Sequence, residues 1–198
     1  MSKLSRSQAI AKTLHTQAEI LGFTVAIMWV TELIDLFVLR GRLDRFGIYP
    51  LQLSGLWGIL WAPFLHHGLG HLIANTIPFV ILGWLVMLQE TYDFFIVATI
   101  SMFVGGLGTW LFGGANTIHL GASGVVFGFL GFLLSRGFFQ RNLPSILLSL
   151  IVGLTYGGLL WGVLPLQPGI SWQGHLFGFI GGAIAARLIA KADTSENL

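Results

Sequence analysis

The sequence predicts an all-α membrane protein, a bundle of six transmembrane helices with a long first loop. Apolar residues make up 55% of the 198 residues, and the mean hydropathy is +0.82. Only 9% of the residues are charged, whereas globular chains average about 25%. A soluble domain of this size has too little interior to hide so much apolar surface. Composition therefore excludes a soluble enzyme and a disordered chain.

Four apolar runs are long enough to cross the hydrocarbon core as helices, which takes about 20 residues. They cover residues 20–39, 71–88, 94–112 and 145–164. Two shorter runs, 123–134 and 175–190, bring the number of spans to six, so both termini should lie on one side. In the long loop between the first two spans, the Trp-bearing stretch 56–65 is short and interrupted by Gly and Pro. We expect it to form an interfacial helix.

The distribution of Lys and Arg predicts a cytoplasmic amino terminus, because this choice puts seven of these residues inside and three outside. The seven are Lys3, Arg6, Lys12, Arg136, Arg141, Arg187 and Lys191, and the three are Arg40, Arg42 and Arg45. The expected organisation is a cytoplasmic segment over 1–18, a six-span domain over 19–192 and a tail over 193–198. Residues 1–18 fit a short surface helix, and a solvated tail without function is the preferred interpretation.

The composition also limits the chemistry. Without Cys there is no disulfide, thiolate metal site or cysteine nucleophile. A net charge of +2 is too small and too dispersed to suggest nucleic-acid binding. His66, His67 and His71 could suggest a metal site, but no carboxylate accompanies them and no His-Glu-x-x-His motif is present. We therefore expect neither a metal nor another cofactor.

Glu32 and Asp35 lie late in the first span, three residues apart and so on one helix face. They could form a proton or ion relay. Acidic residues near a helix end more often reach the interface or pair with basic neighbours. The preferred interpretation is therefore structural: the two acids either reach the interface or pair with Arg40 or Arg42.

Polar side chains from three different spans fall at one depth. Counted from the cytoplasmic ends at about 1.5 Å per residue, Ser123, His175 and Asn75 lie roughly 18–21 Å above the inner boundary. At that depth the fourth span is too short to cross the membrane alone, so residues 113–121 before it must enter the membrane as irregular backbone. Residues 165–173 must do the same before the sixth span. Such backbone survives only where protein buries it or where it lines a wet cavity. We expect a water-filled pocket that opens to the outer face.

This combination of side chains predicts nucleophilic catalysis. Ser123 begins a helix, so its backbone N–H is unpaired and lies at the positive end of the helix dipole. A serine hydroxyl needs a base within hydrogen-bond reach, and His175 is the best candidate at this depth. An oxyanion needs preorganised donors. The Ser123 N–H could serve together with Asn75 and His71, which lie four residues apart on one helix face.

Glycines in the fourth and sixth spans predict a close contact between these two helices. Gly124 and Gly128 have the small-xxx-small spacing, and Gly178 and Gly182 repeat it. Each polar residue also has a structural interpretation, since serine packs membrane helices and a lone His or Asn often only bonds a neighbouring helix. The shared depth favours the catalytic interpretation. His119 has no assigned role.

In three blocks the sequence resembles the rhomboid family of intramembrane serine proteases. The blocks are His66-x4-His71-x3-Asn75 with Gly83, then Gly121 to Gly128, then Gly174 to Gly182. The likeness covers roughly residues 56–190. It implies a rhomboid-like bundle with a Ser123–His175 dyad that needs no acid and cleaves transmembrane segments of single-span membrane proteins.

The resemblance also implies supporting roles. By family analogy His71 and Asn75 help the Ser123 N–H to bind the oxyanion, His66 bonds the first loop, and Phe127 stacks on His175. It implies a bacterial inner membrane, an active site that opens to the outer face, and substrate access past the fifth span. Gly121, Gly124 and Gly178 would support the site through close backbone packing.

Two positions depart from the family's pattern. Many members have Trp-Arg where this chain has Trp57-Gly58, and a Glu commonly stands at the position of Met87, for which Glu90 could substitute. Two other functions compete with proteolysis: a non-catalytic rhomboid-like protein that binds membrane helices, and a haem or metal carrier that uses His71 and His175.

Overall fold

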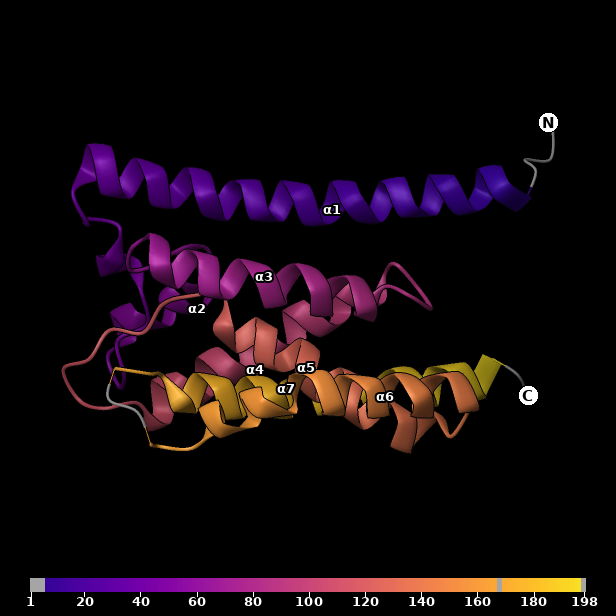
Figure 1. Ribbon diagram of the computed structural model, residues 1–198. Helices are drawn as coiled ribbons and strands as arrows, with labels where there is room; N and C mark the ends of the chain where they lie inside the picture. The colour runs from indigo at the N-terminus through magenta and orange to yellow at the C-terminus, as the bar shows by residue number, and fades with distance from the viewer. Residues whose placement is uncertain (1–5, 167–168, 197–198) are drawn as a thin grey trace.

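The computed structural model describes residues 6–166 and 169–196, and its regular elements are helices (Figure 1). Six helices are long and apolar enough to cross a membrane, as the sequence predicts. The first and the last of the described residues lie at the same end of the bundle. The protein is therefore an integral membrane protein with six spans. Residues 1–5 with Lys3, 167–168 in the second irregular segment and 197–198 in the expected tail lie outside the described residues.

Helix α1 (Arg6–Ile34) continues through a π-helical turn, Asp35–Leu39, as one span of 34 residues. Residues 6–18 are thus helical and continuous with the first span, so they do not form a separate helix. The physical reason is local, because no Pro and no Gly before Gly22 interrupts the helical ladder. The interpretation of these residues as a solvated segment without function stays a prediction. The domain limits at 18/19 and 192/193 stay predictions.

The long first loop contains the short helical segment that the sequence predicts at 56–65. Helix α2 (Gly58–Trp61) is flanked by 3-10 turns, which together cover Leu53–Phe64. At Gly58, a Cβ would lie 2.6 Å from the backbone nitrogen of Ile48 and would overlap the carbonyl of Gly47. An arginine, which the family often has at this position, therefore has no room here.

The remaining spans are α3 (Leu69–Val86), α4 (Asp93–Phe112), α5 (Ser123–Gln140), α6 (Leu143–Tyr156) with a 3-10 extension (Gly157–Val163), and α7 (Trp172–Glu196). Helix α5 is the central helix and packs against α3, α4, α6 and α7. In its most apolar window 61% of the residues are buried, against 6% for α6. The fourth span is thus the interior one, whereas α6 faces mostly lipid.

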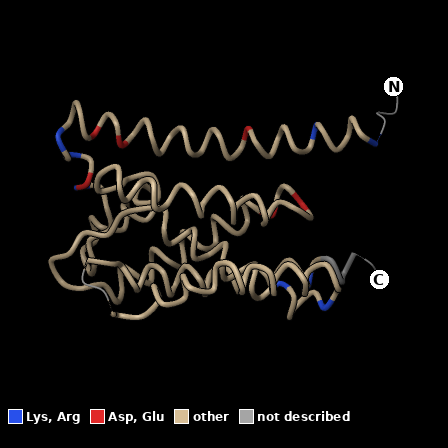
Figure 2. The backbone as a smooth tube through the Cα atoms, viewed as in Figure 1, with Lys and Arg blue, Asp and Glu red and all other residues tan. Residues whose placement is uncertain are grey.

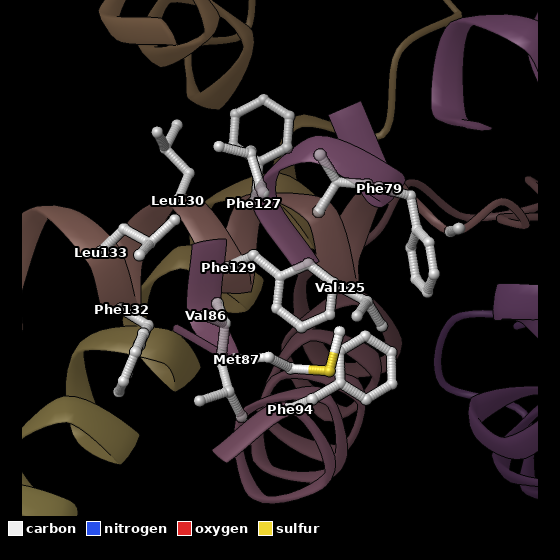
Figure 3. Close-up of a cluster of buried hydrophobic side chains, with 14 of the residues drawn as sticks. Phe79, Val86, Met87, Phe94, Val125, Phe127, Phe129, Leu130, Phe132 and Leu133 are labelled. Carbon is white, nitrogen blue, oxygen red and sulfur yellow. The ribbon is translucent and has the colours of Figure 1, made fainter. Parts of the chain in front are cut away.

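Aromatic side chains form the centre of the core (Figure 3). Phe79 of α3 meets Phe94 of α4 edge-on at 6.0 Å between ring centroids, and it meets Phe129 of α5 at 5.5 Å. Because such ring pairs add to the burial of apolar surface, they hold α3, α4 and α5 in one rigid unit.

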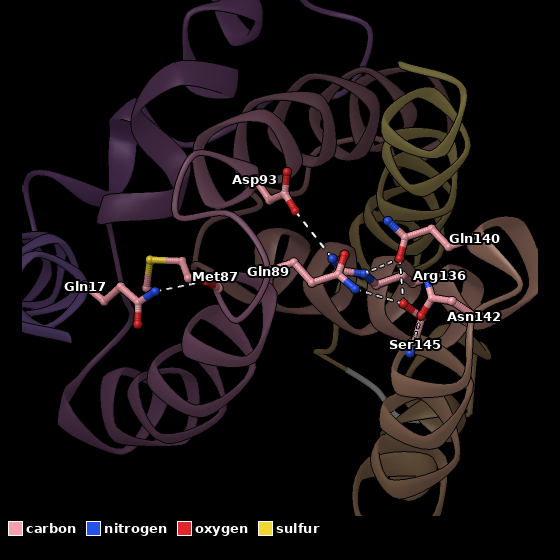
Figure 4. Close-up of polar contacts among 8 residues, drawn as sticks. All are labelled: Gln17, Met87, Gln89, Asp93, Arg136, Gln140, Asn142 and Ser145. Atoms are coloured by element: carbon pink, nitrogen blue, oxygen red, sulfur yellow. Dashed lines mark hydrogen bonds and ion pairs between the residues drawn. The ribbon is translucent and has the colours of Figure 1, made fainter. Parts of the chain in front are cut away.

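Two polar clusters join the helices at the end of the bundle where α1 begins and α7 ends (Figure 4). In the first, Gln17 of α1 donates to the Met87 carbonyl at the end of α3 at 2.9 Å. In the second, the buried Arg136 of α5 lies 3.7 Å from the buried Asp93 of α4. Glu90 is exposed, so it does not substitute for the family's acid at the Met87 position. Asp93 is the buried acid in this region.

Glu32 and Asp35 do not form the expected ion pairs. In the described part of the chain neither carboxylate pairs with Arg40 or Arg42, and each accepts a backbone N–H instead. The expectation of an Arg partner is therefore wrong. The chain turns back at Arg40 in a left-handed conformation (φ 56°), and the two carboxylates meet backbone from the loop.

The predicted glycine contact between the fourth and sixth spans is present. A Cβ at Gly178 would overlap the Gly124 carbonyl, and a Cβ at Gly182 would overlap the Gly128 carbonyl. The backbones of α5 and α7 therefore touch directly, which is the close approach that small residues allow in membranes.

Candidate active site

Ser123 is the first residue of α5 and follows a tight backbone segment. Gly121 has φ +113°, a conformation that favours glycine, and its N–H donates to the Ala62 carbonyl at 2.8 Å. Because Ser123 begins the helix, its own N–H has no acceptor in the helical ladder. The stretch 113–122 before it is irregular, as predicted, and pairs with the first loop through Ile48 and His119.

His175 lies in the first turn of α7 and has a fixed ring. The ring stacks on Phe127 with 4.1 Å between centroids and 7° between planes. Its Nδ1 lies 2.9 Å from the Gly162 carbonyl oxygen. A carbonyl can only accept a hydrogen bond, so Nδ1 carries the proton of the neutral ring. The lone pair is consequently on Nε2.

Ser123 and His175 belong to the same contact between α5 and α7. Phe127, on which the histidine stacks, is one turn after Ser123 and so on the same helix face. A Cβ at Gly124 would reach the Gly174 carbonyl at 3.4 Å, an ordinary contact. Within the described residues no hydrogen bond joins the Ser123 hydroxyl to His175. The structure thus brings the two residues to one interface without a direct bond.

His71 and Asn75 lie on the first two turns of α3. The N–H of His67 donates to His71 Nδ1 at 3.3 Å, so the neutral ring carries its proton on Nε2. A Cβ at Gly121 would lie 2.8 Å from this Nε2. The Asn75 amide donates to the His71 carbonyl at 2.9 Å and has a second N–H. His71 thus presents a donor beside the residues that precede Ser123.

His66 bonds the segment before Ser123. Its Nε2 accepts the N–H of Ala122 at 3.4 Å, whereas the family resemblance implies a bond to the first loop. The side chain is 1% exposed. Burial, together with the nearby His71 ring, lowers the pKa of His66 from 6.5 to about 4. His66 is therefore a neutral link between the start of α3 and the start of α5.

His119, which sequence reasoning left without a role, joins the two halves of the site. Its Nδ1 is 2.7 Å from Ser171 Oγ, and its Nε2 is 2.7 Å from Thr117 Oγ1. The carbonyl of Ser171 accepts the N–H of His175 at 3.2 Å. Burial lowers the pKa of His119. In the sequence, the only indication that His119 connects these segments was its position in an irregular stretch at the depth of the site.

A cavity of about 40 Å³ adjoins Ser123. Its polar lining comes from four elements: Ser101 and Thr109 of α4, His119, Ser123, and Ser171 before α7. One water needs about 10–15 Å³ by this measure, so the cavity can hold water beside the serine. In the described residues no group of His, Asp and Glu side chains has a metal-binding arrangement.

Sequence comparisons identify the family. The family model described as Rhomboid domain matches residues 53–192. An uncharacterized protein of Mycobacterium tuberculosis is 45% identical over 178 residues, which cover 85% of this chain and 73% of that protein. RHOMBOID-like protein 7 of Arabidopsis thaliana is 31% identical over 143 residues, which cover 68% of this chain and 43% of that protein. A Bacillus subtilis relative, 29% identical over 141 residues and 70% of each chain, is provisionally named a rhomboid protease. This six-span chain belongs to the rhomboid family.

Proposed function

We propose that this protein is an intramembrane serine endopeptidase that cleaves transmembrane segments with a Ser123–His175 dyad. The observation that carries the proposal is the fixed ring of His175. It stacks on the helix face that bears Ser123, and its Nδ1 bond to Gly162 leaves Nε2 as a base. Catalytic hydrogen bonds often form or tighten only when substrate binds, so the dyad does not require a direct bond in the free protein.

In the first half of the reaction, Ser123 Oγ attacks the carbonyl carbon of the scissile bond while His175 Nε2 takes its proton. The carbonyl electrons move to oxygen. Ser123 N–H, His71 Nε2–H and an N–H of Asn75 are the proposed donors to this oxyanion. The tetrahedral intermediate collapses when His175 returns the proton to the leaving nitrogen, which breaks the C–N bond.

In the second half, water hydrolyses the acyl-enzyme. The cavity beside Ser123 is large enough to hold that water. His175 takes a proton from the water, and the hydroxide attacks the ester carbonyl to form a second tetrahedral intermediate. When this intermediate collapses, the C–Oγ bond breaks and His175 returns the proton to Ser123 Oγ. No carboxylate is needed in this scheme, because the Phe127 stack and the Gly162 carbonyl orient the histidine.

The proposed substrates are single-span membrane proteins. A folded helix keeps its carbonyls in the i→i−4 ladder, so helix-destabilising residues should mark the cleavage sites. Helix α6 packs chiefly against α5 and is otherwise exposed to lipid, which supports access past the fifth span.

We propose a cytoplasmic amino terminus in the bacterial inner membrane and a site that opens outward. Described basic residues lie at both ends of the bundle, with more at the end that holds the termini (Figure 2). By the positive-inside rule, this asymmetry supports a cytoplasmic location for that end.

The test is covalent labelling with a fluorophosphonate probe, together with cleavage of a single-span substrate that carries a helix-breaking residue. We expect wild type to label and to cleave. Ser123→Ala and His175→Ala should reduce both signals to background. Ser135→Ala is the matched control, since Ser135 is a half-buried serine of the same helix α5, and it should behave as wild type.

Labelling that persists in Ser123→Ala would refute the assignment of the nucleophile. A folded wild type that neither labels nor cleaves would refute the protease and favour the non-catalytic binding protein. A haem band in the visible spectrum of the purified protein would favour the haem carrier.

A further inference from the structure

Glu32 is a carboxylate buried in the first span, and it bonds backbone amides at the start of α3. The side chain is 3% exposed, and Oε1 accepts the N–H of Gly68 at 2.8 Å. Ionisable side chains inside a membrane are costly and usually mark function. The loss of this buried bond would leave the Gly68 N–H without its acceptor, which is costly in a buried site. The bond is therefore a restraint on Gly68.

Gly68 is the end of a turn, residues 66–68, that leads into α3 and prepares His71. Gly68 has φ +87° and caps the helix, and its carbonyl accepts the N–H of Leu72 at 3.1 Å. The middle residue of the turn, His67, donates its N–H to His71 Nδ1. That bond is the one that puts the His71 proton on Nε2, so the position of the turn decides the donor state of His71.

Among the described residues, the carboxylates of Glu32 and Asp44 bond this turn from outside the site, and Glu32 is the buried one. Asp44 Oδ2 lies 2.9 Å from His67 Nδ1, but the His67 side chain is 84% exposed. Exposed pairs of this kind contribute little, typically below about 1 kcal/mol. Glu32 is therefore the main restraint on the outer side of the turn.

We propose that Glu32 is a positioning residue, which orients His71 as an oxyanion donor by holding the turn at residues 66–68. This inference rests on the proposed protease function. Glu32 touches no reacting atom and acts through Gly68 and His67. It predicts a defect in the chemical step and not in substrate binding, because the oxyanion exists only after attack.

Asp35 supplies a matched control. It lies one turn further along the same span, is 5% exposed, and accepts the N–H of Leu43 at 2.8 Å. Asp35 and Glu32 are thus both buried acidic residues, and each accepts a backbone N–H at 2.8 Å. Only the bonded amide differs, since Leu43 belongs to the first loop and not to the histidine turn.

The experiment compares steady-state cleavage of one transmembrane substrate by wild type, Glu32→Leu, Glu32→Gln and Asp35→Leu. A displaced catalytic group or a lost oxyanion donor costs about 10²-fold or more, so Glu32→Leu should lower kcat by about 10- to 100-fold with KM nearly unchanged. Glu32→Gln keeps an acceptor oxygen and should recover most of the wild-type kcat. Asp35→Leu should stay within about threefold of wild type.

Several outcomes would overturn the inference. If Glu32→Leu and Asp35→Leu lose activity equally, or if the loss appears in KM alone, Glu32 has only a general structural role. If wild type itself is inactive, the proposed protease function fails and this inference fails with it. Should Glu32→Leu not fold in detergent, Glu32→Asp replaces it, because it withdraws the oxygen by one methylene. The same loss of kcat is then expected, and an unchanged kcat refutes the proposal.

Discussion

The contact between α5 and α7 leads to the sharpest prediction, which concerns Gly178→Ala. A Cβ at Gly178 would overlap the Gly124 carbonyl of α5 and would lie 3.1 Å from the Gly124 Cα. Helix α7 cannot simply move away, because α4 supports it from another side, where a Cβ at Gly105 would lie 3.2 Å from the Gly178 Cα. The added methyl group must therefore displace α7, which carries His175, relative to α5, which carries Ser123.

The expected magnitudes follow from this overlap. Overpacking of a core costs about 1–3 kcal/mol. A misplacement of catalytic groups by about 1 Å can cost 10²-fold in rate, so we expect Gly178→Ala to lower kcat by about 100-fold. The assays are thermal unfolding in detergent and cleavage of a transmembrane substrate. Gly22→Ala is the control, since nothing lies within 4 Å of a Cβ at Gly22. If Gly178→Ala matches this control in both assays, the backbone contact does not align the dyad.

Three further predictions concern residues around the site and at the opposite end of the bundle. Phe127→Ala removes the ring that stacks on His175, and since such pairs contribute about 0.5–1.5 kcal/mol, kcat should fall by roughly 2- to 13-fold; an unchanged kcat in a folded variant would exclude an orienting role. His66 has a folded pKa of about 4 against 6.5 unfolded, so the unfolded state binds more protons between these values. The contribution of neutral His66 to the free energy of unfolding is fully present above pH 6.5 and should fall by about 3 kcal/mol as the pH decreases to 4. Denaturation of wild type and His66→Phe at several pH values would test this. Equal dependence of the two unfolding free energies on pH would count against it. Arg136→Met leaves the buried Asp93 without its ion pair and should destabilise the bundle by about 3–5 kcal/mol, measured by thermal unfolding; a variant as stable as wild type would contradict the argument.

Some features of the candidate site were predictable from local pattern. Apolar run length determines which segments cross the membrane, and counting residues along a span gives depth. For that reason the order of residues alone was enough to assign Ser123, His175 and Asn75 to one level. The glycine spacing in the fourth and sixth spans likewise predicted the direct contact of α5 and α7 that the structure has.

Other features depend on partners far away in the chain, which no local pattern identifies. Glu32 was expected to meet a nearby arginine, yet it bonds the amide of Gly68. His119 had no expected role, yet it bonds Ser171 beside the start of α7. The family's arginine is absent at Gly58 because backbone from Gly47 and Ile48 occupies that space. Each of these contacts arises from how the loops pack at one end of the bundle.

The sequence by itself determined the six membrane spans and predicted a serine, a histidine and an amide at one level, because hydropathy and helical rise act along the chain. Only the tertiary structure decided the proton positions on His71 and His175. Those depend on the N–H of His67 and the carbonyl of Gly162, each of which leaves its ring one allowed tautomer. The tautomer of each ring depends on its hydrogen-bond partner, and the packing of the chain determines which group becomes that partner.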